Sequence, residues 1–492
     1  MRLNVCLFLF LSTVLCGCLP NEKSPVLLSI DRSDTATGVD TDRGDSNESG
    51  TEPTESNETE DLGGDTEPPP FWIPKGPKQL TLGQVEISCD PSVLITEDGE
   101  WWLCDPAPVP CVPDDPKVNC HIAVRGEAGV TIYDGPVGIE RRGRSSMYYD
   151  KPNYAIEFRD ENGEDNPAPC MGMGKESDWV LDGSWMDRSF IRNDFVLDIF
   201  SELGVKTHYG PDSRFVTLTF NGAPRGIYRL VEKIKRDDDR VDIPKDDGTG
   251  KNFIIKHDID GDLSMSLGLE SDSWSTVYPN PDKVTDTQRS AISDWMQALA
   301  DALNSGDAFT MLNMDNLVDY VLLQELSKNI DGFQYSLYIF KQDGALANMV
   351  PWDFDLSFGQ PDVAYAGDVP NESPEGWILH HTNFIARLLD DDVFVQRLQE
   401  RWVQLRTLPL SDDAVDTRID EYLMVLKGAP IDDNFDIWPI GDVRFDHIYS
   451  VYHVYSIESY DAEIAKLRQW IHDRLDWMDE HLLEYQAFSD KQ

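Results

Sequence analysis

The strongest constraint on the fold is a hairpin signal near the middle of the chain. Residues 215–220 form an alternating apolar run that ends at Asn221-Gly222, and a second apolar run follows at residues 226–231. An Asn-Gly pair between two such runs favours two antiparallel strands joined by a tight turn. Residues 130–133 and 154–158 have the same β-rich pattern. We therefore expect a mostly antiparallel sheet in this part of the chain.

Helical periodicity marks other segments. Residues 189–203 and 317–326 are predicted helices, and residues 336–340 are a predicted strand. From about residue 382 the pattern becomes helical. Near the end, apolar residues recur every three or four positions, at Ile464, Leu467, Ile471, Leu475, Met478 and Leu482. The sequence therefore predicts an α+β protein with a helical C-terminal subdomain.

Composition limits the partners that the chain can have. It has 492 residues, of which 40% are hydrophobic and 13 are Trp, and these values are typical of a globular protein. The formal net charge is −48. A surface this negative repels the phosphate backbone of nucleic acids, so we expect no nucleic-acid partner.

The first 18 residues resemble a bacterial lipoprotein signal peptide. Arg2 precedes a short apolar segment, residues 5–15, which is too short to span a bilayer. The segment ends in Leu-Cys-Gly-Cys, in which Cys18 would be lipidated and become the mature N-terminus. The alternative is an ordinary signal peptide that is cleaved without lipidation. Residues 19–70 are acidic and rich in Ser, Thr and Gly, and they are predicted to be a disordered linker.

The cysteine content agrees with export. Four cysteines belong to a Pro- and Asp-rich N-terminal extension, residues 71–120: Cys89, Cys104, Cys111 and Cys120. In an oxidising compartment such a cluster predicts two local disulfides, whose connectivity the sequence leaves open. A zinc site is the alternative, although no C-x-x-C pair or His pattern accompanies these residues. Cys170 is either free or paired within the cluster.

Two acids spaced two apart lie at the end of an apolar run, in the sequence W-D-F-D that contains Asp353 and Asp355. Asn329 and Asp331 lie shortly upstream. Mg²⁺ is typically held by one or two carboxylates together with phosphate oxygens and water. Phosphoryl transfer depends on positioning and charge neutralisation, so these residues form a candidate kinase site. The alternatives are a calcium-stabilised loop or acids that cap a helix.

A basic turn stands out in this acidic chain. The sequence R-R-G-R-S-S contains Arg142 and Ser145, and Lys151 follows it. Guanidinium and ammonium groups suit phosphate oxygens. Glu232, at the end of the second hairpin strand, could orient a phosphate-binding lysine as the Lys–Glu pair of kinases does. The alternatives are a solvated basic turn and an exposed glutamate.

Taken together, five segments in this order resemble the spore coat protein H (CotH) kinase family. They are R-G-R-S-S with Lys151; D-R-S-F-I-R-N from Asp187 to Asn193; Asn221-Gly222 with Gly226-Ile227-Tyr228 and Glu232; Asn329-Ile330-Asp331-Gly332-Phe333; and W-D-F-D with Gly359. The resemblance covers residues 121–410 and leaves residues 411–492 as the helical C-terminal subdomain. It implies an atypical protein-kinase-like fold, a divalent metal and ATP-dependent phosphorylation of Ser or Thr.

The resemblance also implies roles for individual residues. Asp331 and Asp353 would be catalytic, and the Mg²⁺ or Mn²⁺ ligands would be Asp353, Asp355 and Asn329. The nucleotide-binding residues would be Arg142, Ser145, Lys151 and Glu232. Many members carry a His-Asn pair after the acid, whereas Gly332-Phe333 follow Asp331 here, so substrate or metal positioning departs from the family pattern. Which carboxylate of the pair Asp353 and Asp355 binds the metal stays open.

These features predict an exported atypical protein kinase that uses ATP and phosphorylates exported or surface proteins. Its lipid would anchor it to a bacterial membrane, at the outer membrane or cell surface. One alternative is an inactive surface binding or assembly protein on a kinase-like fold, and another is a metal-stabilised adhesin. The joint presence of Lys151, Glu232 and three aspartates favours the enzyme, because a scaffold does not need them all.

The anchor can be tested directly. Cys18→Ser should release the protein from the membrane fraction, because the substitution removes the thiol that would carry the lipid. Detergent phase separation measures the partitioning of the variant and of the wild type. A wild-type protein that remains in the aqueous phase would contradict lipidation.

Overall fold

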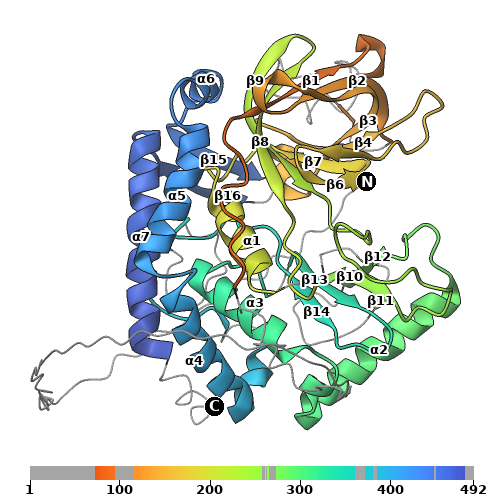
Figure 1. Ribbon diagram of the computed structural model, residues 1–492, viewed down its shortest axis with the longest axis vertical. Helices are drawn as coiled ribbons and strands as arrows, with labels where there is room; N and C mark the ends of the chain where they lie inside the picture. The colour runs from red at the N-terminus through yellow and green to blue at the C-terminus, as the bar shows by residue number, and fades with distance from the viewer. Residues whose placement is uncertain are drawn as a thin grey trace, which may run out of the picture. The chain divides into compact units, whose positions relative to one another are not determined.

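Seven strands of the described chain close into a barrel in the order β1-β2-β3-β4-β7-β9-β8 (Figure 1). Their bounds are β1 (Gly83–Ser88), β2 (Val118–Arg125), β3 (Thr131–Arg142), β4 (Asn153–Phe158), β7 (Asp178–Asp182), β8 (Ser213–Phe220) and β9 (Ala223–Glu232). The β1–β8 pair is parallel, whereas the other neighbouring pairs are antiparallel. The expected sheet is therefore a mixed, closed barrel, and closure satisfies the backbone groups that an open edge would expose.

The predicted hairpin is present as β8 and β9. Asn221 and Gly222 form its turn with φ values of 48° and 76°, and two positive φ values suit the twist of a tight hairpin. Alternate residues of each strand point into the barrel, where Tyr154, Leu218 and Leu230 belong to a buried apolar cluster. The residues between them face outward, and one outward face forms a wall of the candidate site.

A second sheet has the strand order β11-β12-β10-β13-β14. Its strands are β10 (Phe253–His257), β11 (Leu263–Ser264), β12 (Ser273–Tyr278), β13 (Leu337–Lys341) and β14 (Asn348–Val350), and a separate two-stranded sheet consists of β5 (Ala168–Cys170) and β6 (Met173–Glu176). Strand β13 confirms the strand predicted at residues 336–340.

Three helices accompany these sheets. Helices α1 (Arg192–Glu202) and α3 (Met314–Ser327) confirm the two helices predicted there. Helix α2 (Asp286–Ser305) was not predicted. Its ends are nevertheless marked in the sequence, because Thr285 and Gln288 form a capping box and Gly306 ends the helix in a left-handed conformation.

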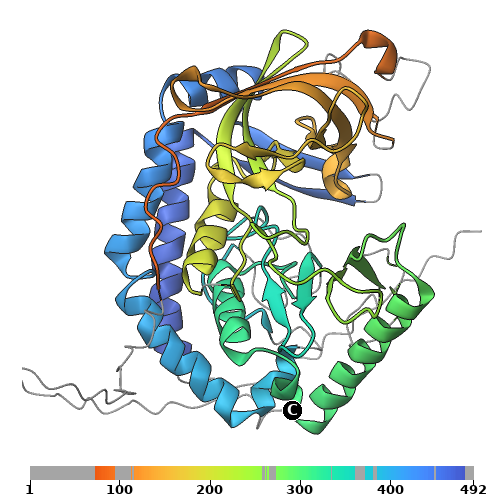
Figure 2. The ribbon, with the colours of Figure 1, turned by 45° about the vertical axis from the view of Figure 1, so that its right-hand side comes forward.

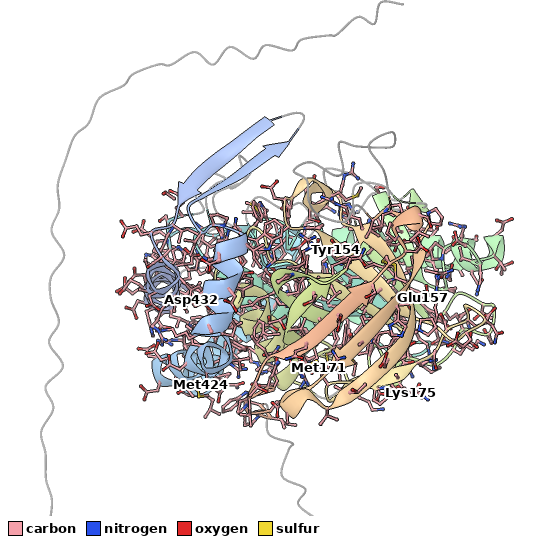
Figure 3. All side chains as sticks on the ribbon, turned by 90° about the horizontal axis from the view of Figure 1, so that it is seen from above. Tyr154, Glu157, Met171, Lys175, Met424 and Asp432 are labelled. Carbon is pink, nitrogen blue, oxygen red and sulfur yellow. A yellow bond between two sulfur atoms is a disulfide. The ribbon has the colours of Figure 1, made fainter. Side chains whose placement is uncertain are left out.

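The C-terminal part is helical except for one hairpin. Its helices are α4 (Asp392–Thr407), α5 (Asp412–Leu426), α6 (Ala429–Ile437) and α7 (Tyr460–His481). Helix α7 confirms the predicted apolar periodicity. The prediction of helix throughout this region is wrong between α6 and α7, where two strands pair, β15 (Asp442–His447) and β16 (Ser450–Ser456). Seen from above, this hairpin projects from the body and α6 lies against the barrel (Figure 3), where it contacts β9.

One apolar core joins elements that are far apart in sequence. It includes side chains from α1, α3, α4, α5 and α7, and Figure 2 shows α5 and α7 side by side next to α1. Residues 71–120 contribute β1 and the beginning of β2 to the barrel, and residues 411–492 contribute α5 and α7 to this core. Pro68–Gln492 form one compact unit, so the boundaries expected at residues 120 and 410 do not separate structural units.

The computed structural model describes residues 72–94, 112–113, 116–204, 206–257, 261, 263–264, 273–333, 335–360, 372–379, 385–447 and 450–482. The predicted signal peptide with Cys18 and the linker at residues 19–70 lie outside these ranges. None of the helices within them is long and apolar enough to cross a membrane.

A disulfide connects the first two barrel strands. Cys89, directly after β1, is bonded to Cys120 on β2, and this confirms one link within the predicted cluster. Cys104 and Cys111 lie outside the described residues. Cys170 is a buried free thiol. The bond closes the excursion between β1 and β2, a sequence separation of 31 residues.

Removal of this disulfide should lower stability. In the chain-entropy treatment a loop of this length contributes roughly 3–4 kcal/mol, so the double variant Cys89→Ser/Cys120→Ser should lose about that free energy of unfolding. Urea denaturation of the oxidised wild type, the double variant and the reduced wild type measures it. Identical unfolding midpoints in the three samples would show that this bond does not stabilise the fold.

Candidate active site

Four buried or partly buried carboxylates converge where the barrel approaches the second sheet. Asp353 and Asp355 follow β14, Asp331 follows α3, and Asp182 ends β7. Burial raises the pKa of Asp355 well above its usual range, and Asp353, Asp182 and Asp331 raise it further by repulsion. Burial also raises the pKa of Tyr149, and the same four carboxylates add to this effect. The structure therefore brings together the three predicted aspartates and adds Asp182 and Tyr149.

Asp353 and Asp355 share a hydrogen bond between their side chains. Two carboxylates can make such a bond only when one of them holds a proton. Burial raises the pKa of both carboxyls, and the shared bond raises the pKa of Asp355 further while lowering that of Asp353. A divalent cation could replace that proton, because Mg²⁺ and Mn²⁺ prefer oxygen ligands.

The described residues contain no three His, Cys, Asp or Glu side chains that are already arranged to hold a metal ion. The donors that are present, Asp353 and Asp355, match the one or two carboxylates that Mg²⁺ uses when phosphates and water complete its coordination. Their role as metal ligands stays a prediction.

The backbone at Asp353 is strained and is held from two sides. Its φ of 65° lies in the left-handed region, which costs a non-glycine residue roughly 1–2 kcal/mol. Asn329 Nδ2 donates to the Asp353 carbonyl oxygen over 2.9 Å, and the Phe354 N–H donates to Asn193 Oδ1 over 2.8 Å. Two neutral amides therefore fix the conformation that turns Asp353 into the site.

The D-R-S-F-I-R-N segment supports the same loop. Arg192 donates Nε to the Ser357 carbonyl oxygen over 3.1 Å. Its guanidinium also makes buried ion pairs with Asp187 at 2.6 Å and Glu463 at 2.8 Å. Beyond Ser357 the loop turns at Gly359, with a φ of 75°, where a Cβ atom would lie 2.5 Å from Trp470 Cδ1. These residues are therefore structural supports of the W-D-F-D loop.

Asn329 and Asp331 belong to one short turn after α3. The Asp331 N–H donates to Asn329 Oδ1 over 3.3 Å, while Asn329 Nδ2 is used by Asp353. Both functional groups of Asn329 therefore bind backbone. Its observed role is to join the Asp331 turn to the W-D-F-D loop, and its predicted role as a metal ligand is untested.

The outward face of the barrel supplies the opposite wall. Asp182 on β7 is directly opposite Arg229 on β9, and Arg229 Nη1 lies 2.7 Å from Asp182 Oδ2. Arg142, at the end of β3, lies 5.9 Å from the ring centroid of Trp352. Burial raises the pKa of Asp353, and Arg142 and Arg229 partly oppose this. The Arg142 guanidinium donates no hydrogen bond to any described residue.

Lys151 does not form the predicted pair with Glu232. It is 1% exposed, and its Nζ donates to the Ile227 carbonyl oxygen and, over 3.1 Å, to Asn434 Oδ1. Burial and the nearby Arg188 lower the pKa of Lys151 well below its usual range. The predicted pairing is wrong because Ile227 and Glu232 are five residues apart on β9, roughly 16 Å at the rise of a strand.

Glu232 is buried elsewhere, at the far end of β9. Its Oε2 accepts from Tyr209 Oη and from the Asp212 N–H, each at 3.1 Å. Burial raises the pKa of Glu232 to about 7. Its predicted nucleotide contact is untested, as is that of Ser145, whose side chain lies outside the described atoms.

The chain matches the family described as CotH kinase protein over residues 139–478. That range is more than half of the sequence. The chain belongs to the CotH kinase family. Among curated proteins, inner spore coat protein H of Bacillus subtilis (strain 168) is 23% identical over 341 residues, which cover 66% of this chain and 82% of the relative.

The CotH match extends beyond residue 410 into α7. This agrees with the shared core, and it makes α5, α6 and α7 part of the family domain. Asn434 on α6 illustrates the dependence, because its Oδ1 accepts from Lys151 Nζ and from the Ile227 N–H. Gly226 permits this contact, since a Cβ atom there would lie 2.3 Å from Asn434 Oδ1.

Sequence reasoning missed three residues of this CotH site: Asp182, Tyr149 and Asn193. Asp182 had a usable signal, because it ends an apolar strand directly before Gly183, as Asp353 ends the apolar run of β14. Asn193 was part of a recognised motif, but its contact with Phe354 spans 161 residues. Tyr149 carries no sequence signal that we can identify.

The raised pKa of Glu232 predicts a pH-dependent stability. The folded state holds the proton up to about pH 7, whereas an unfolded glutamate loses it near pH 4.3. Ionisation of Glu232 therefore destabilises the fold as the pH rises between these values, by up to roughly 4 kcal/mol.

Glu232→Gln keeps an oxygen for Tyr209 and Asp212 but cannot ionise. Its loss of stability between pH 5 and pH 8 should be smaller than that of the wild type in urea denaturation. The control is Glu164→Gln, which changes an exposed glutamate and should follow the wild-type pH profile. An unchanged profile for Glu232→Gln would contradict the assigned pKa.

Proposed function

We propose that this CotH-family protein transfers the γ-phosphate of ATP to Ser or Thr side chains of exported or surface proteins. One observation carries the proposal, namely the convergence of Asp331, Asp353 and Asp355 at the strained W-D-F-D loop. A folded chain gains nothing from burying like charges together, because each raises the cost of ionising the others. Such an arrangement is typical of a site that binds a cation or transfers a proton.

The family relationship suggests a division of labour in the site. A bound Mg²⁺ or Mn²⁺ would neutralise charge on the phosphates of ATP. Asp353 and Asp355 would hold that ion, and the proton that they share would leave on binding. Asp331 would accept the proton of the acceptor hydroxyl, because it comes from the separate turn after α3. Arg142 would donate its open guanidinium to phosphate oxygens.

The buried lysine departs from the usual kinase arrangement. Lys151 has a lowered pKa and donates to two neutral oxygens, so it supplies little charge to a phosphate in this conformation. This observation favours the second candidate function, a surface binding or assembly protein on a kinase-like fold that has lost turnover. The name of the relative, a spore coat protein, is compatible with either function.

We further propose that the protein is exported and anchored by lipid at Cys18, where it would meet exported protein substrates. The disulfide between Cys89 and Cys120 supports an oxidising compartment. A nucleic-acid partner is disfavoured by the net charge of −48.

Substitution of the site aspartates tests the kinase. Asp331→Asn should remove the proton acceptor and Asp355→Asn a metal charge, and each should lower phosphoryl transfer by roughly 10²-fold or more. Stability should change little, because relief of carboxylate repulsion offsets lost hydrogen bonds. The assay is incubation of the purified protein with labelled ATP and Mn²⁺ or Mg²⁺, scored for autophosphorylation and nucleotide binding.

Asp282→Asn, at an exposed position, is the matched control and should retain wild-type transfer. A wild type that binds Mn²⁺ and ATP but transfers no phosphate would favour the binding protein. Site variants that are as active as the wild type would exclude this site from catalysis.

A further inference from the structure

The segment before the barrel, residues 72–82, runs in extended form across α1 and reaches β1, and we name it the strap. Near its start the Ile73 N–H donates to the Glu202 carbonyl oxygen over 2.8 Å. Near its end Gln79 exchanges two hydrogen bonds with the backbone of Phe215 on β8, at 2.7 and 2.8 Å. The strap is therefore fixed both to α1 and to the barrel.

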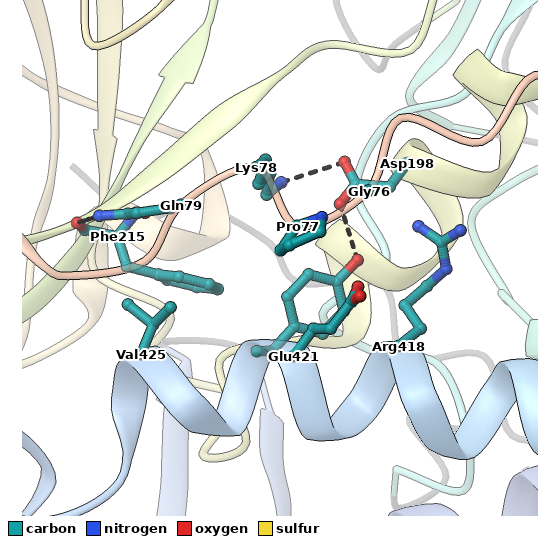
Figure 4. Close-up of a pocket in the computed structure, with 10 residues that line it drawn as sticks. Gly76, Pro77, Lys78, Gln79, Asp198, Phe215, Arg418, Glu421 and Val425 are labelled. Carbon is teal, nitrogen blue, oxygen red and sulfur yellow. Dashed lines mark hydrogen bonds and ion pairs between the residues drawn. The ribbon is translucent and has the colours of Figure 1, made fainter.

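Lys78 is the charged centre of the strap. Its ammonium lies 2.5 Å from Asp194 and 3.0 Å from Asp198, both on α1, and 3.8 Å from Asp212. Figure 4 shows Lys78 directed at Asp198, which also accepts from Tyr422 Oη over 2.7 Å. The cavity beneath the strap has a volume of about 10 Å³, enough for one water. The ammonium of Lys78 is thus paired with these carboxylates and is not available to a larger ligand.

Asp194 connects Lys78 to the candidate site. Its other oxygen, Oδ2, lies 2.5 Å from Arg229 Nε, and Arg229 Nη1 lies 2.7 Å from Asp182 Oδ2. Lys78, Asp194, Arg229 and Asp182 therefore form a continuous chain of ion pairs from the strap to the carboxylate cluster. Burial acts to raise the pKa of Asp194, but Arg229 and Lys78 outweigh it, and the pKa is lowered.

Two adjacent residues in the first turn of α1 support the candidate site. Asn193 holds the Phe354 N–H of the W-D-F-D loop, and the next residue, Asp194, holds Arg229. Without Lys78, Arg229 would no longer share the Asp194 carboxylate with a second cation. The attraction between Asp194 and Arg229 would therefore become stronger. Arg229 would then shift toward Asp194 and loosen its contact with Asp182.

We propose that Lys78 is a positioning residue of the candidate site, acting through Asp194 and Arg229 to hold Asp182. The strap follows the linker in sequence, so anything that detaches the strap would also loosen Asp182. The inference rests on the proposed function only where metal binding or phosphoryl transfer is the readout, and its structural part can be measured without either.

Lys78→Met should disturb Asp182 in the full chain. The reporter is the Ser184 N–H, which donates to Asp182 Oδ1 over 2.9 Å. Hydrogen exchange at Ser184 should become about tenfold faster, since this is the effect of losing one average hydrogen bond. Mn²⁺ affinity, measured by electron paramagnetic resonance, should fall by up to about tenfold, the low end of the cost of a disturbed outer shell, because Asp182 is one of the carboxylates around the predicted ligand Asp355. Lys78→Arg should restore both.

Lys75→Met is the matched control. Lys75 belongs to the same strap, but its Nζ bonds Ser201 Oγ at 2.9 Å and does not lead to Arg229. It should leave the exchange of Ser184 and the binding of Mn²⁺ unchanged. If Lys78→Met does not fold, Lys78→Met/Asp198→Asn removes one buried carboxylate together with the cation, with Asp198→Asn as its reference.

The outcomes separate the two proposals. Folded Lys78 variants with wild-type exchange at Ser184 would overturn the positioning role, as would an equal acceleration in Lys75→Met. If the wild type transfers no phosphate but exchange at Ser184 is faster in Lys78→Met, the proposed kinase activity is overturned and the positioning role is supported.

Discussion

The site depends on how like charges are kept close together. Asp182, Asp331 and Asp353 raise the cost of ionising Asp355, and repulsion among the four carboxylates alone would drive the loops apart. Neutral amides oppose it, because Asn329 and Asn193 hold the backbone of the W-D-F-D loop. The loop is thus fixed without cancelling the charge of its side chains. That charge can still be neutralised by a cation or by a proton, as the raised pKa of Asp355 indicates.

The cations around the site are distributed unevenly, so the carboxylates differ in how far their charge is balanced. Arg229 is shared between Asp194 and Asp182, so Asp182 is largely compensated. Burial raises the pKa of Asp353 and Asp355, and within the described chain Arg142 and Arg229 act on Asp353 without forming an ion pair with it. Arg142 lies over Trp352 and keeps its donors open among the described residues. One wall of the site therefore carries its own charge compensation, whereas the described residues form no ion pair with Asp353 or Asp355 on the loop opposite it.

The sequence predicted features whose causes are local. The β8–β9 hairpin followed from Asn221-Gly222, and α7 from its apolar periodicity. Barrel closure was not predictable in this way, because β1 pairs with a strand more than a hundred residues later. The proposed Lys151–Glu232 pair failed because Lys151 binds the backbone of Ile227, five residues along β9 from Glu232. The three site aspartates were found because two lie in one motif, whereas Asp182 is brought to them only by the order of strands in the barrel.

Several residues in the motifs that resemble the CotH family hold the backbone in position. Arg192 supports the W-D-F-D loop, and Gly226 lets Asn434 approach β9 closely enough to bind Lys151 and Ile227. A buried lysine with two neutral acceptors and a lowered pKa stabilises packing between β9 and α6. Among the described residues, side-chain charge without an ion pair is found instead at Arg142, Asp353 and Asp355. Membership of a motif therefore does not identify a residue that contacts substrate, because burial and hydrogen-bond partners decide whether its charge is still available.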